Sequence, residues 1–353
     1  MNRRTFLEVA GGAVAAEMSA PAASIPIIDT HIHLFDPRRP QGMPWPDKND
    51  KVLYHPALPD RYRKIAAPLG IVGAIEVEAS PWLEDNQWVL DVAAKDTIIV
   101  GTVGDLEPGK PEFRKQLERL HRNPLFRGIR YGNLWNRNIS AELDKPAFVA
   151  DLKLLADAGL ELDTANQDAV LIAATVRLTD LVPSLRVVID HLPQMEPPAD
   201  AAAHLAYTAN LRELGKRPQV YVKISEVLRR VDGRVPEDLN FYRPRLDELW
   251  EIFGEDRLLY GSDWPNSDLW AQYPQVLKIV REYFTSKGPA AAEKYFWKNS
   301  VAAYRWVKRE TGQPQLRVAP PRGSVEWNQA SDYHRRSGGN AATDGNAEPV
   351  RHH

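Results

Sequence analysis

The sequence predicts a single (β/α)8 barrel, in which eight parallel strands close into a cylinder surrounded by helices. From about residue 26, short β-branched runs alternate with longer amphipathic stretches, which is typical of parallel βα units. There are eight such runs, the strand number of a closed barrel. The first run is followed by Phe35-Asp36-Pro37, so the glycine-rich turn of a doubly wound nucleotide-binding sheet is missing.

In chain order, the predicted strands are residues 27–33, 72–78, 98–104, 126–131, 160–165, 186–191, 220–225 and 258–263. The amphipathic segments between them include residues 87–95, 111–122, 145–158, 167–182 and 244–253. The loop after the first strand, residues 36–59, is long and rich in Pro and Trp. Loops of that length are often functional, so we expect a lid over the barrel mouth.

Both ends of the chain differ from the barrel, which we expect to span residues 26–310. In residues 1–25, Arg3-Arg4 resembles a bacterial twin-arginine export signal, although Glu8 and Glu17 interrupt its short apolar stretch. This segment is either a leader or a disordered tail, so the expected location is periplasmic in the first case and cytoplasmic in the second. Residues 311–353 are polar and glycine-rich, which predicts a tail.

The composition is that of an ordinary globular protein. The chain has 353 residues, 26% of them charged, with a formal net charge of -2. This balance favours a small-molecule partner over nucleic acid or a membrane surface, and leaves the oligomeric state open. There is no cysteine, which excludes disulfides and thiolate metal sites, and no apolar run is long enough to span a membrane.

Reactive side chains gather at the predicted strand ends, and the carboxyl ends of the strands form the active-site face of such barrels. They are His31, His33, Glu76, Glu78, Arg127, Arg130, His191, Lys223, Ser225 and Asp263.

Strand alternation predicts which of these side chains share a face. Asp29, His31 and His33 should point the same way, and Glu76 and Glu78 should both face the barrel, with Glu78 nearer the mouth. On the fourth strand, alternation favours Arg130 over Arg127 at the mouth.

Taken together, four motifs resemble the amidohydrolase superfamily. They are Asp29-Thr30-His31-Ile32-His33, Ile189-Asp190-His191-Leu192-Pro193, Tyr221-Val222-Lys223-Ile224-Ser225 and Gly261-Ser262-Asp263-Trp264-Pro265. The resemblance covers residues 27–305 and is greatest to the amidohydrolase-related branch, which holds sugar-lactone hydrolases and 2-pyrone-4,6-dicarboxylate lactonase.

The resemblance implies a role for each matched residue. His31 and His33 correspond to a pair that binds a divalent metal in many members. Asp263 corresponds to the aspartate that takes a proton from the attacking water, and His191 to the histidine that contacts the substrate carbonyl or the water. An aspartate beside a metal or two imidazoles stays ionised and can accept that proton.

The metal itself is left open. Metal-using members commonly have a histidine at the end of the fifth strand, where this chain has Leu160-Glu161-Leu162-Asp163-Thr164-Ala165. Zinc would find about three ligands in His31, His33 and Asp263, with Glu78 a possible fourth. The lactonase branch also lacks the strand-five histidine, and members there can work without metal.

Four residues are predicted to bind the substrate. Arg130 suits a carboxylate or a hydroxyl-rich ring. Lys223 would either stabilise a developing oxyanion or form a buried ion pair with a neighbouring carboxylate. Trp82 and Trp264 would flank the mouth and either stack on the substrate ring or close hydrophobic gaps.

Together these features predict a hydrolase that opens a lactone of a sugar acid or related acid, with water activated at Asp263. Two alternatives remain: a metal-dependent non-oxidative decarboxylase of the same superfamily, and a barrel that binds a sugar acid without turning it over. Tightly bound zinc whose removal abolishes activity would favour the decarboxylase.

Overall fold

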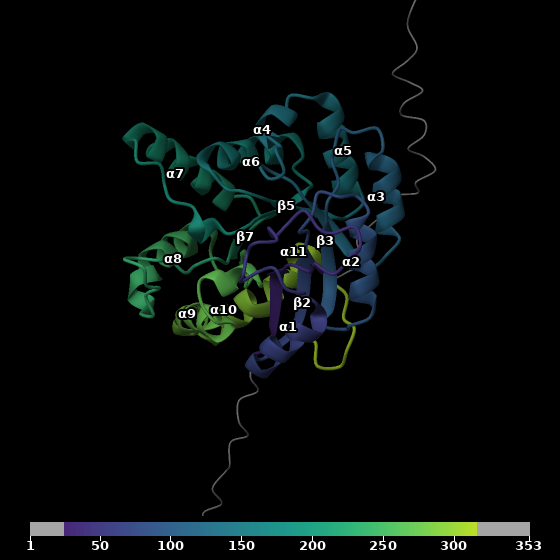
Figure 1. The fold of residues 1–353 in the computed structure, drawn as a ribbon. Helices are drawn as coiled ribbons and strands as arrows, with labels where there is room; N and C mark the ends of the chain where they lie inside the picture. Colours follow the sequence, from purple (N-terminus) through teal and green to yellow (C-terminus); the bar gives the residue numbers. More distant parts are fainter. Residues whose placement is uncertain (1–24, 316–353) are drawn as a thin grey trace, which may run out of the picture.

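The computed structural model describes residues 25–315, in which eight parallel strands form the centre of the molecule and helices surround them (Figure 1). Each strand pairs with the next one along the chain. The strands are β1 (Ile27–Ile32), β2 (Ile71–Val77), β3 (Ile99–Gly104), β4 (Phe126–Arg130), β5 (Glu161–Thr164), β6 (Arg186–Ile189), β7 (Val220–Ile224) and β8 (Leu258–Tyr260). The predicted (β/α)8 barrel is therefore confirmed.

The cylinder closes where the end of β8 meets β1. The backbone N–H of Asp263 donates to the carbonyl of His31 at 2.9 Å, and that of His33 donates to the carbonyl of Trp264 at 2.8 Å. These two bonds hold the segment after β8 alongside the end of β1. Residues more than 230 positions apart in the sequence are thus brought into contact.

Most of the helices occupy the outer layer and carry the chain from one strand to the next, whereas the last one packs against the residues inside the barrel. The helices are α1 (Pro59–Ala66), α2 (Asp85–Ala94), α3 (Phe113–His121), α4 (Ile139–Glu142), α5 (Pro146–Asp157), α6 (Ala169–Leu181), α7 (Ala201–Gly215), α8 (Leu239–Phe253), α9 (Tyr273–Ser286), α10 (Pro289–Glu293) and α11 (Asn299–Tyr304). Four single turns join them: η1 (Ala67–Leu69), η2 (Leu192–Gln194), η3 (Asn266–Leu269) and η4 (Lys294–Lys298).

The core has two parts because each strand has two buried faces. Inside the barrel, Ile28, Ile75, Val188 and Leu259 pack together with residues of and after α11, including Trp306. The larger cluster lies between the strands and the helices. Burial on both faces explains why the strands read as near-continuous apolar runs.

Two predictions about strand faces are wrong. The pairing of β1 with β2 shifts register between Asp29 and Ile32, so the alternation changes phase before His31. Asp29 therefore points to the helix layer, where its Oδ2 accepts hydrogen bonds from Tyr62 and Tyr273 at 2.8 Å each.

Glu76 also points outward. It lines a cavity with Asn86 and Val89 of α2, while Ile75 and Val77, its neighbours on β2, pack inside the barrel. Alternation predicted that Glu76 and Glu78 share a face, but it could not say whether that face was the inner or the outer one. Glu78 follows β2 at the rim and lines the cavity at the barrel mouth.

The elements of the barrel run from Ile27 to Tyr304, inside the predicted span of residues 26–310. The leader-like segment, apart from residue 25, and most of the predicted tail lie outside the described residues, so these two predictions stay predictions. Within residues 25–315, none of the helices combines the length and the apolarity that crossing a bilayer requires.

Candidate active site

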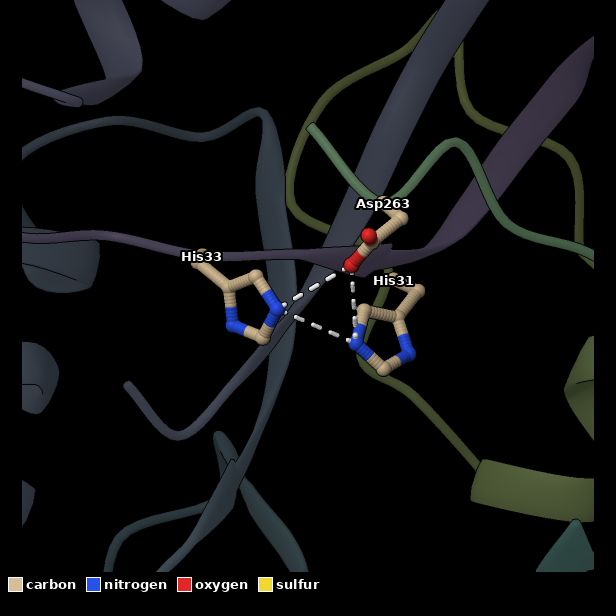
Figure 2. Close-up of side chains that lie close together, drawn as sticks. All are labelled: His31, His33 and Asp263. Carbon is tan, nitrogen blue, oxygen red and sulfur yellow. Dashed lines mark hydrogen bonds and ion pairs between the residues drawn. The ribbon is translucent and has the colours of Figure 1, made fainter. Parts of the chain in front are cut away.

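The carboxyl ends of β1 and β8 bring two imidazoles and a carboxylate together (Figure 2). His33 Nε2 lies 3.1 Å from Asp263 Oδ1, and His31 Nε2 lies 3.5 Å from the same oxygen. The two Nε2 atoms are 3.3 Å apart. All three residues are buried, His33 being the most exposed at 3%.

His191 joins this cluster from the end of β6. Its Nε2 lies 3.7 Å from Asp263 Oδ1, and its ring centre is 4.3 Å from that of His31. The Nδ1 atom is 2.8 Å from the hydroxyl of Ser225, which follows β7. The four residues singled out from the sequence, His31, His33, His191 and Asp263, thus converge on one rim of the barrel.

The hydrogen bonds of His33 place its proton. Nδ1 lies 2.8 Å from the carbonyl oxygen of Val77, which can only accept, so Nδ1 carries the hydrogen and Nε2 presents a lone pair to the centre. Burial lowers the pKa of His33 to about 4, and the ring is therefore neutral near pH 7.

His31 has the opposite arrangement. Its Nδ1 lies 3.0 Å from the ammonium of Lys223, which can only donate, so this nitrogen accepts and the hydrogen is on Nε2. Burial, and next the charge of Lys223, hold the pKa of His31 well below its usual range. The contact between the two Nε2 atoms is then a hydrogen bond from His31 to His33.

The 3.1 Å contact between His33 and Asp263 joins two acceptors when the carboxylate is ionised, so a proton or a cation must lie between them.

The three donor atoms also have the spacing of a metal site. The distances of 3.1, 3.3 and 3.5 Å between them match the spacing of about 3.3 Å between ligands that hold zinc tetrahedrally. A divalent cation therefore fits between His31, His33 and Asp263. To bind it, His31 would have to shift its proton from Nε2 to Nδ1, towards Lys223. Glu78, the possible fourth ligand, is not part of this group of donors.

Below the histidines, Lys223 belongs to a buried network of four charges. Its ammonium lies 2.5 Å from Asp163 Oδ2 and 2.9 Å from Asp190 Oδ1, and Asp190 Oδ2 lies 3.0 Å from Arg130 Nε. Although burial opposes its charge, the two aspartates raise the pKa of Lys223, which stays an ammonium. Of the two roles considered for Lys223, the structure supports the buried ion pair, because the side chain is fully buried and does not line the cavity.

Asp263 is adapted to exchange a proton near neutrality. Burial raises its pKa to about 7, against the lowering effects of a hydrogen bond with Glu226 and of the charge of Arg130. Glu226, directly after β7, lies close by, with Oε2 3.8 Å from His191 Nδ1. Burial, and then the charge of Asp263, raise the pKa of Glu226 well above its usual range.

A cavity of about 540 Å³ opens above this cluster, a size that suits a small-molecule substrate. Arg130 lines it, as strand alternation predicted, whereas Arg127 donates to the backbone carbonyl of Arg305. The predicted tryptophans do not line it. Trp264 is fully buried against Tyr62, and Trp82, which is 37% exposed, lies outside the cavity.

Trp45 and Trp135 line the cavity instead, together with the polar side chains of Asn166, Gln167, Gln194, Glu226 and Asn266. Trp45 comes from the long loop after β1, in agreement with the expected lid. Sequence reasoning missed Trp135, Glu226, Asp163 and the charge role of Asp190. The sequence did contain a sign of the role of Asp163. Glu161 and Asp163 are two carboxylates at alternate positions of a buried strand, and such groups require a nearby cation.

Backbone strain is concentrated on the same rim. Trp135, Asn166, His191, Glu226 and Asp263 all have φ between +47° and +59°, a region that residues other than glycine rarely adopt. Such strain clusters at functional sites, where the surrounding structure holds it in place.

Comparison with known proteins agrees with this geometry. The family model described as Amidohydrolase matches residues 28–306. Among curated proteins, the chain is 29% identical over 292 residues to an L-fucono-1,5-lactonase of Burkholderia ambifaria, covering 81% of this chain and 97% of that protein.

Two solved structures have similar folds. An amidohydrolase from Burkholderia multivorans with bound zinc superposes with a TM-score of 0.69 at 23% identity, covering 80% of this chain and 99% of that one. A probable 2-pyrone-4,6-dicarboxylic acid hydrolase from Acinetobacter baumannii, with citric acid bound, gives a TM-score of 0.61 at 18% identity, covering 79% and 99%.

Proposed function

This chain belongs to the amidohydrolase family, in its lactonase-like branch, and from that premise we propose that it hydrolyses the lactone of a sugar acid at Asp263. The observation that carries the proposal is the convergence of Asp263 with His31, His33 and His191 at the base of the cavity.

Asp263 acts as the general base. A carboxylate whose pKa is about 7 is ionised in about half of the molecules at neutral pH, and its basicity suits proton abstraction from water. The water oxygen bonds to the lactone carbonyl carbon while its proton moves to Asp263. When the tetrahedral intermediate collapses, the ring C–O bond breaks and the proton passes from Asp263 to the departing ring oxygen. The product is the open hydroxy acid.

The imidazoles orient the water and the carbonyl. The N–H of His31 Nε2 donates to His33 at 3.3 Å; on substrate binding it would turn to the carbonyl oxygen, which also frees the lone pair of His33. His191 lies beside it, with Nδ1 held by Ser225. Neutral imidazole donors stabilise negative charge on the carbonyl oxygen as it develops in the transition state. His33 presents an acceptor and helps to hold the water against Asp263.

The residues of the site also fit a divalent cation, zinc above all. His31, His33 and Asp263 would hold it, and it would polarise the attacking water.

We propose a neutral, hydroxyl-rich lactone as substrate. Among the residues that line the cavity, Arg130 is the one permanent cation, and it is already paired with Asp190 at 3.0 Å. An anionic substrate would find no uncommitted positive charge there, whereas the amides of Gln167, Gln194 and Asn266 suit hydroxyl groups. This favours an aldonolactone, the class named for the Burkholderia relative, over a pyrone dicarboxylate.

The same charge argument weighs against a decarboxylase, whose substrate carries a carboxylate. On β5, which lacks the histidine that metal-using members commonly have there, Asp163 is bound by Lys223. A binding protein without turnover remains as the contrasting hypothesis, and the experiment below separates the three.

The test is a panel of aldonolactones and a pyrone dicarboxylate, followed by the release of acid, with chelated enzyme and with added zinc. We expect turnover of at least one neutral aldonolactone and none of the dicarboxylate. Carbon dioxide release from aromatic acids would support the decarboxylase. Binding of lactones without turnover in either metal condition would support the binding protein and overturn the proposal.

A further inference from the structure

We propose that Trp135 is a specificity-determining residue, whose indole forms an apolar wall of the cavity and packs on the ring face of the substrate. This inference rests on the proposed function, since it assigns a contact to the lactone that the site would bind.

Trp135 belongs to the loop between β4 and α4, and hydrogen bonds of its indole nitrogen hold the side chain in position. The indole N–H, the only polar group of the side chain, donates to both carboxylate oxygens of Glu78, at 3.1 Å and 3.3 Å. Glu78 Oε2 also accepts the backbone N–H of Ser80 at 3.0 Å, so the acceptor itself is held in place. The ring is therefore anchored from a second strand end and does not swing freely with its loop.

The backbone supports the same conclusion. Trp135 and Asn136 both have φ of +58°, a conformation that is unfavourable for residues other than glycine. Two consecutive residues in this region turn the loop sharply. Strain of this kind persists where the surrounding structure fixes a side chain in one position, and it is common in segments that hold ligands.

A second indole lines the same cavity. Trp45, from the loop after β1, packs edge-on against His33, with ring centres 5.6 Å apart, and against Phe35 at 5.2 Å. Trp45 and Trp135 thus supply aromatic surface in a cavity whose other lining groups are mostly polar. A sugar lactone has hydroxyl groups at its edges and C–H groups on its faces, and therefore needs both kinds of surface.

Of the two indoles, Trp135 is the one that can be removed without disturbing a catalytic residue. Trp45 also packs on Phe35 and His33, so its removal would disturb the catalytic histidine. Trp135 contacts neither histidine of β1 nor Asp263 by any hydrogen bond or ring contact recorded for residues 25–315. Its loss should change substrate binding and leave the chemical step in place.

The experiment compares Trp135→Ala and Trp135→Phe with Trp82→Ala as the matched control. Trp82 is also a loop tryptophan at a strand end, but it lies outside the cavity. With a lactone that the wild type hydrolyses, we expect KM to rise about tenfold in Trp135→Ala with kcat within about twofold, the signature of lost ground-state binding. Trp135→Phe keeps a ring face and loses the anchor to Glu78, so its KM should rise by a smaller factor. Trp82→Ala should match the wild type.

A second measurement keeps the two proposals distinguishable. Titration with an aldonolactone should change the intrinsic fluorescence of the wild type and of Trp82→Phe, and this change should be largely lost in Trp135→Phe. Melting temperatures of all variants show whether they are folded. If the wild type binds these ligands with that fluorescence pattern but turns none of them over, the proposed hydrolase fails and the role of Trp135 stands. If hydrolysis occurs and neither KM nor fluorescence depends on Trp135, the inference is overturned alone. If no ligand is bound or hydrolysed, both are overturned.

Discussion

His31 and His33 are two residues apart at the end of β1, yet their surroundings place their protons oppositely. His33 faces the carbonyl of Val77 with Nδ1 and offers a lone pair to the centre. His31 faces the ammonium of Lys223 with Nδ1 and offers an N–H. The difference shows that a His-x-His motif specifies two positions, whereas the second partner of each ring decides what chemistry the position performs. Four predictions test this contrast and the carboxylate that both rings face.

The largest expected effect is on the carboxylate. Asp263→Asn keeps the shape of the side chain but removes the base, so kcat/KM for lactone hydrolysis should fall by about 10²- to 10⁴-fold. Ligand binding, followed by fluorescence, should persist. The control is Asp256→Asn, at the exposed opposite end of β8, which should retain wild-type rates. A loss of less than tenfold for Asp263→Asn would remove this residue from the mechanism.

The next largest effect concerns the ammonium that sets the proton of His31. Lys223→Met leaves Asp163 and Asp190 buried without this cation, and it should lower the free energy of unfolding by about 3–5 kcal/mol. Denaturant unfolding measures this free energy. Lys216→Met, at an exposed ion pair, should change stability by about 0.5 kcal/mol or less.

A double variant sharpens the interpretation. Adding Asp163→Asn to Lys223→Met removes one of the stranded charges, so part of the lost stability should return. If the double variant is as unstable as the sum of the two single variants, the two side chains are not coupled, and the assignment of an ion pair fails.

The pH dependence of the reaction should follow Asp263 and not the histidines. A base is inactive when protonated, so kcat/KM of chelated enzyme should fall about tenfold per pH unit below the pKa of Asp263, about 7, and level off above it. Because the pKa of His33 is about 4, no second inflection should come from this ring between pH 5 and 7. Rates corrected for spontaneous lactone hydrolysis would contradict this if they were flat from pH 5 to 8.

The smallest expected effect is spectroscopic. In enzyme labelled with nitrogen-15 at histidine, His31 should show a protonated Nε2 and His33 a protonated Nδ1, each assigned by the loss of its signals in a histidine-to-asparagine variant. Identical tautomers for the two rings would contradict the contrast between them. Added zinc should shift the proton of His31 to Nδ1, since a metal ligand must present a lone pair.

The sequence was sufficient for the architecture and for much of the site. All eight observed strands begin within one residue of the predicted start, and all lie inside or within one residue of the predicted ranges. The prediction that His31, His33, His191 and Asp263 converge needed only the rule that parallel strands place their carboxyl ends on one rim. The helix expected at residues 244–253 in fact begins at Leu239, so Pro244, which was expected at its start, lies inside it.

The direction and the surroundings of individual side chains could not be predicted from the sequence pattern. Asp29 and Glu76 point outward because register shifts and the phase of alternation depend on how neighbouring strands pair. Trp264 is buried and Trp135 lines the cavity because loop paths, not strand positions, decide where their indoles lie.

By itself, therefore, the sequence determined the barrel and the gathering of reactive residues at its mouth, since both follow from local patterns and their order along the chain. Only the tertiary structure decided which nitrogen of each histidine carries the proton, which cation is already paired and which tryptophans face the substrate. These properties depend on contacts between residues far apart in the sequence, such as Lys223 with His31 and Glu78 with Trp135.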